Sequence, residues 1–172
     1  MVSVIKEQRG FVMEVRRIQG NDIERVMDIY DVSRDFMIKS GNQTQWPAHY
    51  PNPELLKSDV AKDGYVVVED NEIIGVFVLS GSEEAYDTID GAWLNDEPYG
   101  TIHRLASGGA RKGVGQFILD WCLDKVGNIR IDTHEHNIPM RKLLEKNGYE
   151  YCGKVVYEGY GERLAFQKLK SK

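Results

Sequence analysis

The stretch TIHRLASGGARKGVGQ (residues 101–116) decides the fold, because it reads as a strand, a glycine-rich turn and the start of a helix. Glycines let backbone N–H groups approach a ligand closely, and the positive end of a helix dipole attracts anions. Lys112 is followed by Gly113 rather than by the Ser or Thr of a P-loop, and Gly113-Val114-Gly115 lacks the third glycine of the Rossmann fingerprint. The stretch therefore predicts an anion-binding turn for another kind of phosphate-bearing ligand.

The pattern around this stretch predicts alternating strands and helices. Apolar spacing and turn signals predict the order β-α-α-β-β-β-α-β-α-β-β. We expect helices from residue 22 to 40, 54 to 62, about 114 onward and 137 to 146, and strands at 13–18, 65–70, 72–80, 99–106, 128–133, 149–159 and 162–169. This order predicts an α/β (α+β) fold: a mixed sheet with helices on both faces, parallel where strands 99–106 and 128–133 are joined through a helix.

Length and composition narrow the class of protein. The chain has 172 residues and a formal net charge of −5. We expect a loose leader at residues 1–12, a single domain at 13–172 and, from the acidic charge, no nucleic-acid partner. The sequence has no apolar run long enough for a membrane span and no signal-peptide core, so we expect a cytoplasmic protein without a membrane partner, with Cys122 and Cys152 reduced. The histidines and cysteines lack metal-ligand spacing, so no metal is expected.

Two motifs together carry a resemblance to a known family. I-H-R-L-A-S followed by R-K-G-V-G-Q, and D-T-H-E-H-N-I-P-M-R-K-L-L-E-K-N-G-Y, resemble segments of the GNAT superfamily of acetyl-CoA-dependent N-acetyltransferases. The resemblance covers about residues 13–170 and implies a mostly antiparallel sheet with a splayed parallel strand pair. It implies transfer of an acetyl group from acetyl-CoA to a primary amine of a small molecule or peptide by direct attack. The alternatives are a non-catalytic CoA-binding sensor or regulatory module and a protein N-acetyltransferase; a homodimer is possible by analogy.

The resemblance also implies where CoA is bound. Its pantetheine would pair with the backbone of Leu105, Ala106 and Ser107, and Asn137 would bond it from the other wall. Its pyrophosphate would meet the loop residues Arg111, Lys112, Gly113, Val114, Gly115 and Gln116. Lys142 and Lys146 would reach the extra phosphate of the nucleotide. Alternatively, Asn137 is only a helix cap, and the basic side chains of Arg111, Lys112, Lys142 and Lys146 are solvated. Two positions depart from the family pattern: Ala110 replaces a Gln or Arg, and Leu144 replaces a tyrosine that often acts as general acid.

The candidate catalytic residues lie on the strand that opens the deciding stretch. Strand alternation predicts Thr101, His103 and Leu105 on one face, and His103 is the candidate base. The alternative is a packed histidine without a chemical role. Backbone N–H groups of Leu105 and Ala106 are the candidate oxyanion donors. His134 and Tyr149 are weaker candidates, and Tyr149 also fits a core position.

The acceptor site is predicted from the loop at residues 41–53. Trp46 and Tyr50 would contact the acceptor, and Gln45 lies in the same loop. Alternatively, the two aromatic rings pack in the core. Acidic residues cluster before the candidate catalytic strand, at Glu83, Glu84, Asp87, Asp90, Asp96 and Glu97. They would either attract an amine or belong to a solvated loop.

Overall fold

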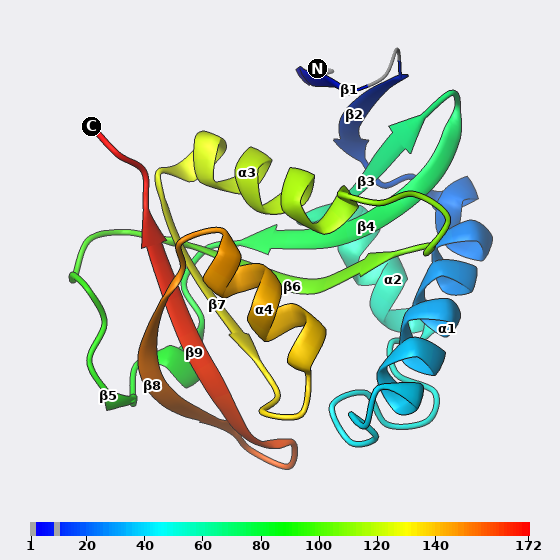
Figure 1. Cartoon of the computed structure of the whole chain (residues 1–172). Coiled ribbons are helices and arrows are strands. Elements are labelled where there is room, and N and C mark those ends of the chain that lie inside the picture. Colours follow the sequence, from blue (N-terminus) through cyan, green and yellow to red (C-terminus); the bar gives the residue numbers. More distant parts are fainter. Residues whose placement is uncertain (1–2, 9–10) are drawn as a thin grey trace.

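The computed structural model describes residues 3–8 and 11–172. Within these residues nine strands form one sheet, in the order β1-β2-β3-β4-β6-β7-β9-β8-β5 (Figure 1). The strands are β1 Ser3–Gln8, β2 Phe11–Arg17, β3 Gly64–Glu69, β4 Glu72–Ser80, β5 Asp90–Gly91, β6 Gly100–Ser107, β7 Asn128–Thr133, β8 Glu150–Tyr157 and β9 Gly161–Leu169. The α-helices are α1 Ile23–Lys39, α2 Pro53–Ala61, α3 Val114–Val126 and α4 Ile138–Lys146, with 3-10 turns at Gly20–Asp22 and Glu84–Tyr86.

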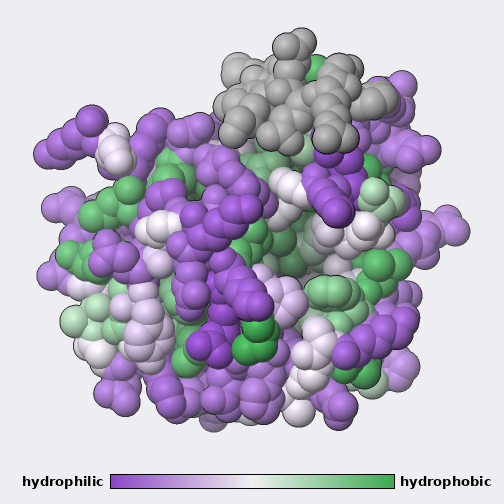
Figure 2. Space-filling view, viewed as in Figure 1, coloured by the Kyte–Doolittle hydropathy of each residue, from purple (hydrophilic) through white to green (hydrophobic). Residues whose placement is uncertain are grey.

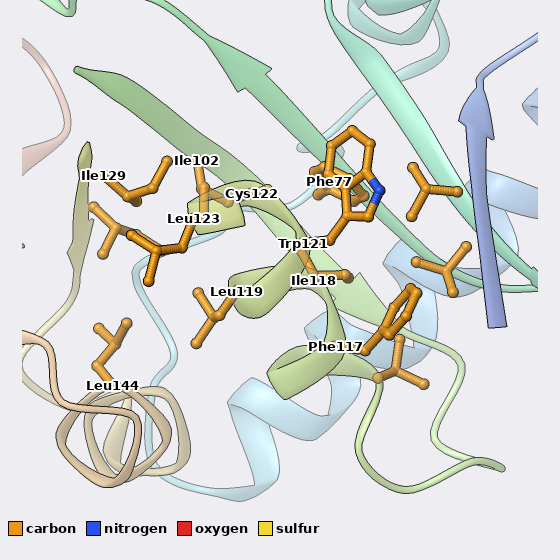
Figure 3. Close-up of a cluster of buried hydrophobic side chains, with 14 of the residues drawn as sticks. Phe77, Ile102, Phe117, Ile118, Leu119, Trp121, Cys122, Leu123, Ile129 and Leu144 are labelled. Atoms are coloured by element: carbon orange, nitrogen blue, oxygen red, sulfur yellow. The ribbon is translucent and has the colours of Figure 1, made fainter. Parts of the chain in front are cut away.

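Helices cover both faces of the sheet, as the sequence predicts. Helices α3 and α4 pack on one face, where Phe77, Ile118, Trp121 and Leu144 belong to a large buried cluster (Figure 3). Helices α1 and α2 pack on the opposite face over a second cluster, which contains Ile29 among its fully buried members. The helical spacing of apolar residues in α3 therefore encodes its buried side.

The predicted bounds agree closely with the observed ones in the middle of the chain. The β3–β4 hairpin turns at Asp70 and Asn71, whose φ values of 51° and 63° are those of a tight two-residue turn. Strand β7 has the predicted bounds, and α2 begins at Pro53 with Asn52 as its cap. The predicted fold class, a mixed sheet with one parallel pair, is confirmed.

The N-terminal prediction needs a correction. Residues 1–12 were expected to form a loose leader, but Ser3–Gln8 forms strand β1, which pairs antiparallel with β2. The first strand of the predicted domain begins at Phe11 rather than at Met13. Residues 1, 2, 9 and 10 of the expected leader lie outside the described residues. The short segment before Phe11 can form a strand because the edge of β2 offers unpaired backbone groups.

The parallel pair β6–β7 separates along its length. Its pairing consists of Gly100 with Ile129 and Thr101 with Arg130, at the start of both strands. Beyond this point the two strands diverge, as Figure 1 shows. The sheet is therefore open between β6 and β7 over their carboxyl halves. No helix in the described part of the chain is long and apolar enough to cross a membrane.

Candidate active site

A bulge in β6 determines which side chains face the opening in the sheet. The pairing with β4 shifts between Val76–Ala106 and Val78–His103, and Arg104 has a φ of 48°. Arg104 is anchored at this conformation by Asp59 of α2, whose Oδ1 lies 2.6 Å from its Nη2. A bulge adds one residue to a strand and so reverses the alternation of faces beyond it.

The predicted alternation along this strand is therefore wrong for Leu105. Leu105 packs with the cluster under α3 and α4, whereas His103 borders a cavity on the opposite side and Thr101 donates a hydrogen bond to the Gly81 carbonyl. The bulge separates these positions, because Arg104 and Leu105 together lie opposite the single residue Phe77 of β4, between the pairs Val78–His103 and Val76–Ala106.

His103 lies in a cavity of about 230 Å³ beside the predicted acceptor residues Trp46 and Tyr50. The other residues that line this cavity are Gln45, Ile102, Arg104, Asp132, Tyr157, Tyr160 and Arg163. Trp46 is buried in the core against Tyr30 as well as bordering the cavity, so both of its expected roles are compatible with its position. The aromatic rings continue from Trp46 to Tyr50 and Tyr160, with centroid separations of 6.2 and 6.3 Å.

The imidazole of His103 is paired with a carboxylate from the loop that follows β4. Nε2 of His103 lies 3.2 Å from Oε2 of Glu83. Hydrogen bonding to His103 is the main cause that lowers the pKa of the Glu83 carboxyl, against the effect of partial burial. The Glu83 backbone is held by the Tyr99 hydroxyl, which accepts its N–H at 3.1 Å. An ionised Glu83 favours the tautomer of neutral His103 with its proton on Nε2, which leaves the lone pair of Nδ1 available.

A second polar group on the cavity wall centres on Asp132 of β7. Its Oδ2 accepts hydrogen bonds from the hydroxyl groups of Tyr86 and Tyr157, both at 2.7 Å. Burial and the charge of Asp132 raise the pKa of both tyrosines. The two phenols therefore remain protonated donors and hold the carboxylate in place.

A smaller cavity of about 40 Å³ lies between the separated strands and adjoins the first. Five residues line both cavities: Gln45, Trp46, Ile102, Arg104 and Asp132. Asn137 borders the smaller one; its Oδ1 caps α4 through the Met140 N–H, and its amide nitrogen donates to Oε1 of Gln45. Thr133 also borders it, and its buried Oγ1 has no hydrogen-bond partner among the residues that the structure describes.

The glycine-rich turn ends at the start of α3, as predicted. Gly113 is the N-cap, with a φ of 84° that favours glycine. Within the described chain, no backbone N–H from residue 109 to residue 116 is hydrogen-bonded to a carbonyl in normal geometry, whereas Gly108 and Phe117 on either side donate to Ile74 and Gly113. The Arg111 side chain points to β3, because its Nε bonds both oxygens of Glu69 at 3.0 and 3.1 Å. The turn thus offers a row of donors without a neighbouring acceptor.

Three further positions from the sequence lie away from the larger cavity. Leu144 is fully buried in the cluster beneath α3 and α4, so its side chain borders neither cavity, and Met140 is the apolar residue of α4 that does. Tyr149 is a core residue, as expected from one of its two interpretations. His134 contacts Thr44, at 3.3 Å between Nε2 and Oγ1, and burial and the Arg163 charge lower its pKa.

Sequence reasoning did not single out Asp132, Tyr157 or Arg163, and it left Glu83 within a general acidic cluster. Asp132 and Arg163 come from β7 and β9, and they approach His103 only through the strand order of the sheet. One signal was available for Glu83, because antiparallel pairing of Ser80 with Thr101 brings the residues after β4 close to the start of β6.

Figure 2 shows that one face of the molecule is largely hydrophilic, with hydrophobic residues visible in a recess near its middle. Among residues 3–8 and 11–172, no group of three or more His, Cys, Asp or Glu side chains is arranged to hold a metal ion.

Comparison with solved structures gives close matches over almost the whole chain. An acetyltransferase of the GNAT family from Streptococcus agalactiae 2603 is 36% identical, with a TM-score of 0.84, over 93% of this chain and 96% of that one. A GNAT-family acetyltransferase from Listeria monocytogenes 4b F2365 shares the fold at 17% identity, with a TM-score of 0.70, over 97% and 99% of the two chains. No protein-family model and no curated protein sequence matches the chain. On the identity and coverage of the streptococcal structure, and on the two motifs and the separated β6–β7 pair, this chain belongs to the GNAT family of acetyltransferases.

Proposed function

We propose that the protein is a cytoplasmic N-acetyltransferase that uses acetyl-CoA to acetylate a primary amine of a small molecule or peptide. The observation that carries this proposal is the row of unpaired backbone N–H groups from residue 109 to residue 116, next to an opening in the sheet that leads to His103. Backbone N–H groups at a helix N-terminus fit phosphate oxygens, and separated strands fit an extended arm that carries amides.

The residues on the opening fit such a cosubstrate. The unpartnered, buried Oγ1 of Thr133 offers a hydrogen bond from β7, and residues 105–107 follow the bulge on β6. Asn137 bonds Gln45 and caps its helix, which orients the wall of the opening, and the second hydrogen of its amide would bond the arm. The Arg111 side chain is held by Glu69, so the phosphates would be bound mainly by backbone groups of residues 111–116.

His103 is the candidate base because the amine must lose a proton. An alkylamine with a pKa of ~10.4 is deprotonated at pH 7 at a cost of about 4–5 kcal/mol. Bound acetyl-CoA supplies an acetyl thioester, whose thiol has a pKa of ~8.5 and leaves without a strong acid. Glu83 holds the Nε2 proton of His103, and Nδ1 is the atom that accepts a proton from the acceptor amine.

The rest of the site orients the acceptor. Trp46, Tyr50 and Tyr160 supply aromatic rings to the cavity, and Asp132, which also lines it, would attract an ammonium group. The backbone N–H groups of Leu105 and Ala106 remain the candidate oxyanion donors. A cavity of about 230 Å³ is small, which favours a small acceptor or the terminus of a peptide.

Binding of acetyl-CoA tests the cosubstrate. At a concentration of about 100 times Kd, a ligand stabilises the folded state by about 2.7 kcal/mol. For a chain of this size we expect Tm to rise by roughly 5–10 °C. Acetyl-pantetheine, which lacks the phosphates, is the matched control and should give a smaller rise. An unchanged Tm at saturating acetyl-CoA would contradict the proposal.

Turnover separates an enzyme from a sensor. Release of free CoA thiol is followed with a panel of primary amines, and the acetylated product is identified by mass spectrometry. Binding of acetyl-CoA without transfer to any amine would favour the sensor or regulatory module instead.

A further inference from the structure

The larger cavity contains a buried cation without a matching anion. Arg163 of β9 is 6% exposed, and its Nη1 donates to the carbonyls of Tyr160 and Glu162, both at 2.9 Å. Its Nε and Nη2 make no hydrogen bond to any residue in the described part of the chain, and no carboxylate there lies within 4.0 Å of it. A buried guanidinium bound only to two carbonyls is costly unless an anion completes its contacts.

The charges of the two other largely buried arginines near the site have partners, although the Nε of each lacks a hydrogen-bond partner among the described residues. Arg104 is paired with Asp59, and Arg130 lies between the rings of Trp93 and Tyr99 at 4.3 and 4.0 Å from their centroids. Arg104 also lines the cavity, and its Nε has no hydrogen-bond partner in the described part of the chain, but its charge is paired with Asp59. Of these three, Arg163 is the one that lines the cavity without a carboxylate partner among the described residues. Its charge therefore remains available to a molecule that enters the cavity.

The cavity carries opposite charges on its lining. Among the described residues, Asp132 is the one carboxylate that lines it. The Tyr86 and Tyr157 hydroxyl groups donate to that carboxylate, which lies more than 4.0 Å from the Arg163 nitrogens. His103 and Asp132 thus offer groups for an amine, and the Arg163 fork offers two N–H donors for an oxyanion. The aromatic rings of Tyr50 and Tyr160 lie at the same cavity and suit an apolar spacer.

We infer that the acceptor is an amine that also carries an oxyanion, a carboxylate or a phosphonate-like group, which Arg163 binds. The inference names the substrate class of the proposed function and rests on that function for the reaction, although oxyanion binding is measurable without turnover. In this arrangement Arg163 is a specificity-determining residue, since it acts on the end of the acceptor that does not react.

Matched acceptor series test the inference. The series are α-amino acids and ω-amino acids of increasing length, the primary carboxamide of each, and the corresponding aminoalkylphosphonates. We expect the wild-type protein to favour an oxyanion series over the carboxamides in kcat/KM, and comparison of the carboxylates with the phosphonates identifies the anion. Arg163→Gln should reduce that preference by roughly 10- to 100-fold, mainly through KM.

A matched control excludes a general structural effect. Arg141→Gln removes another guanidinium that donates to a backbone carbonyl, that of Glu135, but lies outside the cavity. It should leave the preference unchanged. A loss of folding in Arg163→Gln would lower activity towards both series equally and would be seen as a lower Tm, and Arg163→Lys, which keeps the charge, should then retain part of the preference. Equal use of oxyanions and carboxamides by the wild type, or an unchanged preference in both Arg163 variants, would overturn the inference.

Binding distinguishes failure of this inference from failure of the proposed function. In the presence of CoA, oxyanion-bearing amines should raise Tm more than their carboxamides, and Arg163→Gln should abolish the difference. This result without any acetyl transfer would support the Arg163 site and contradict the acetyltransferase proposal. Acetyl transfer to amines with and without an oxyanion at equal rates would support the acetyltransferase proposal and contradict the Arg163 site.

Discussion

His103 and Glu83 form a pair whose chemistry depends on which imidazole nitrogen carries the proton. The contact between Nε2 and the Glu83 carboxylate directs Nδ1 to the role of proton acceptor. Glu83 is therefore a positioning residue in the proposed mechanism, because it acts through His103 rather than on the acceptor.

Substitution of Glu83 tests this role. Glu83→Gln should lower kcat by roughly 10- to 100-fold, the equivalent of a charge-assisted hydrogen bond worth ~1.5–3 kcal/mol. The loss should appear in kcat with little change in KM for the acceptor, because Glu83 acts through His103 and does not line the cavity. Glu84→Gln, at the exposed adjacent position, is the matched control and should behave as the wild type. An unchanged kcat in Glu83→Gln would refute the positioning role.

Residue types in one strand predicted His103 as a candidate, but not its neighbours. The motif around residues 101–116 and the residues of the loop at 41–53 were legible because they are local in sequence. Asp132 and Arg163 line the same cavity as His103, and Glu83 contacts His103 from a third segment. The approach of these residues depends on sheet order. The roles of His103, Trp46 and Tyr50 stay predictions until they are tested.

At the scale of elements, the junction between β6 and α3 combines a sharp turn with unpaired N–H groups. Gly113 and Gly127 sit at the two ends of α3 with φ values of 84° and 83°, and an added Cβ at either would meet no atom within 4 Å. The two glycines thus have the same backbone requirement but lie at opposite helix ends.

Alanine at these glycines separates stability from cosubstrate binding. Gly113→Ala and Gly127→Ala should each lower the free energy of unfolding by about 1–2 kcal/mol, the cost of a left-handed conformation for alanine. Only Gly113→Ala should also weaken acetyl-CoA binding, by about tenfold, because it alters the turn whose N–H groups face the phosphates. Calorimetric titration gives both affinities. Equal affinity in the two variants would argue against a phosphate site at this turn.

The sequence predicted most element bounds because apolar periodicity, caps and turn residues are local signals. Helix α2 begins at Pro53 after the cap Asn52, and the Asp70-Asn71 turn sets the β3–β4 hairpin. The bulge at Arg104 was not predicted, since it depends on Asp59 holding the arginine from a different layer. Strand β1 was missed as well, because its pairing with β2 is an edge contact that the expectation of a loose leader did not include.

At the scale of the whole molecule, an ion pair links the sheet to the helix layer on one face. Both Nη atoms of Arg16 on β2 donate to the carboxylate of Asp22, at 2.7 and 3.0 Å, just before α1. The same carboxylate accepts the Gln19 N–H at 2.8 Å. The hydrogen bond from Arg16 is the main cause that lowers the pKa of Asp22.

The lowered pKa of Asp22 makes its contribution to stability dependent on pH. A carboxyl with a depressed folded-state pKa stabilises the protein above its unfolded-state value of ~3.9, and this stabilisation is lost as pH falls through the folded-state value. Asp22→Asn should therefore lower the free energy of unfolding by about 1–3 kcal/mol at pH 7. The difference from the wild type should shrink below about pH 4, as measured by urea unfolding. A difference that is constant down to pH 2 would show that the charge of Asp22 contributes nothing.

The short pairing between β6 and β7 has a mechanical consequence for the whole sheet. Strands β1 to β4 and β6 form one part of the sheet, and β7, β9, β8 and β5 form the other. Among the described residues, the two parts are paired only through the two residue pairs at the start of β6 and β7. Across the gap, the two helices beside it meet where the backbone of Gly115 approaches Leu143, whose Cδ2 lies 2.8 Å from the place a Cβ at residue 115 would occupy. A side chain at residue 115 would therefore require Leu143 to move, at a contact between α3 and α4 that borders neither cavity.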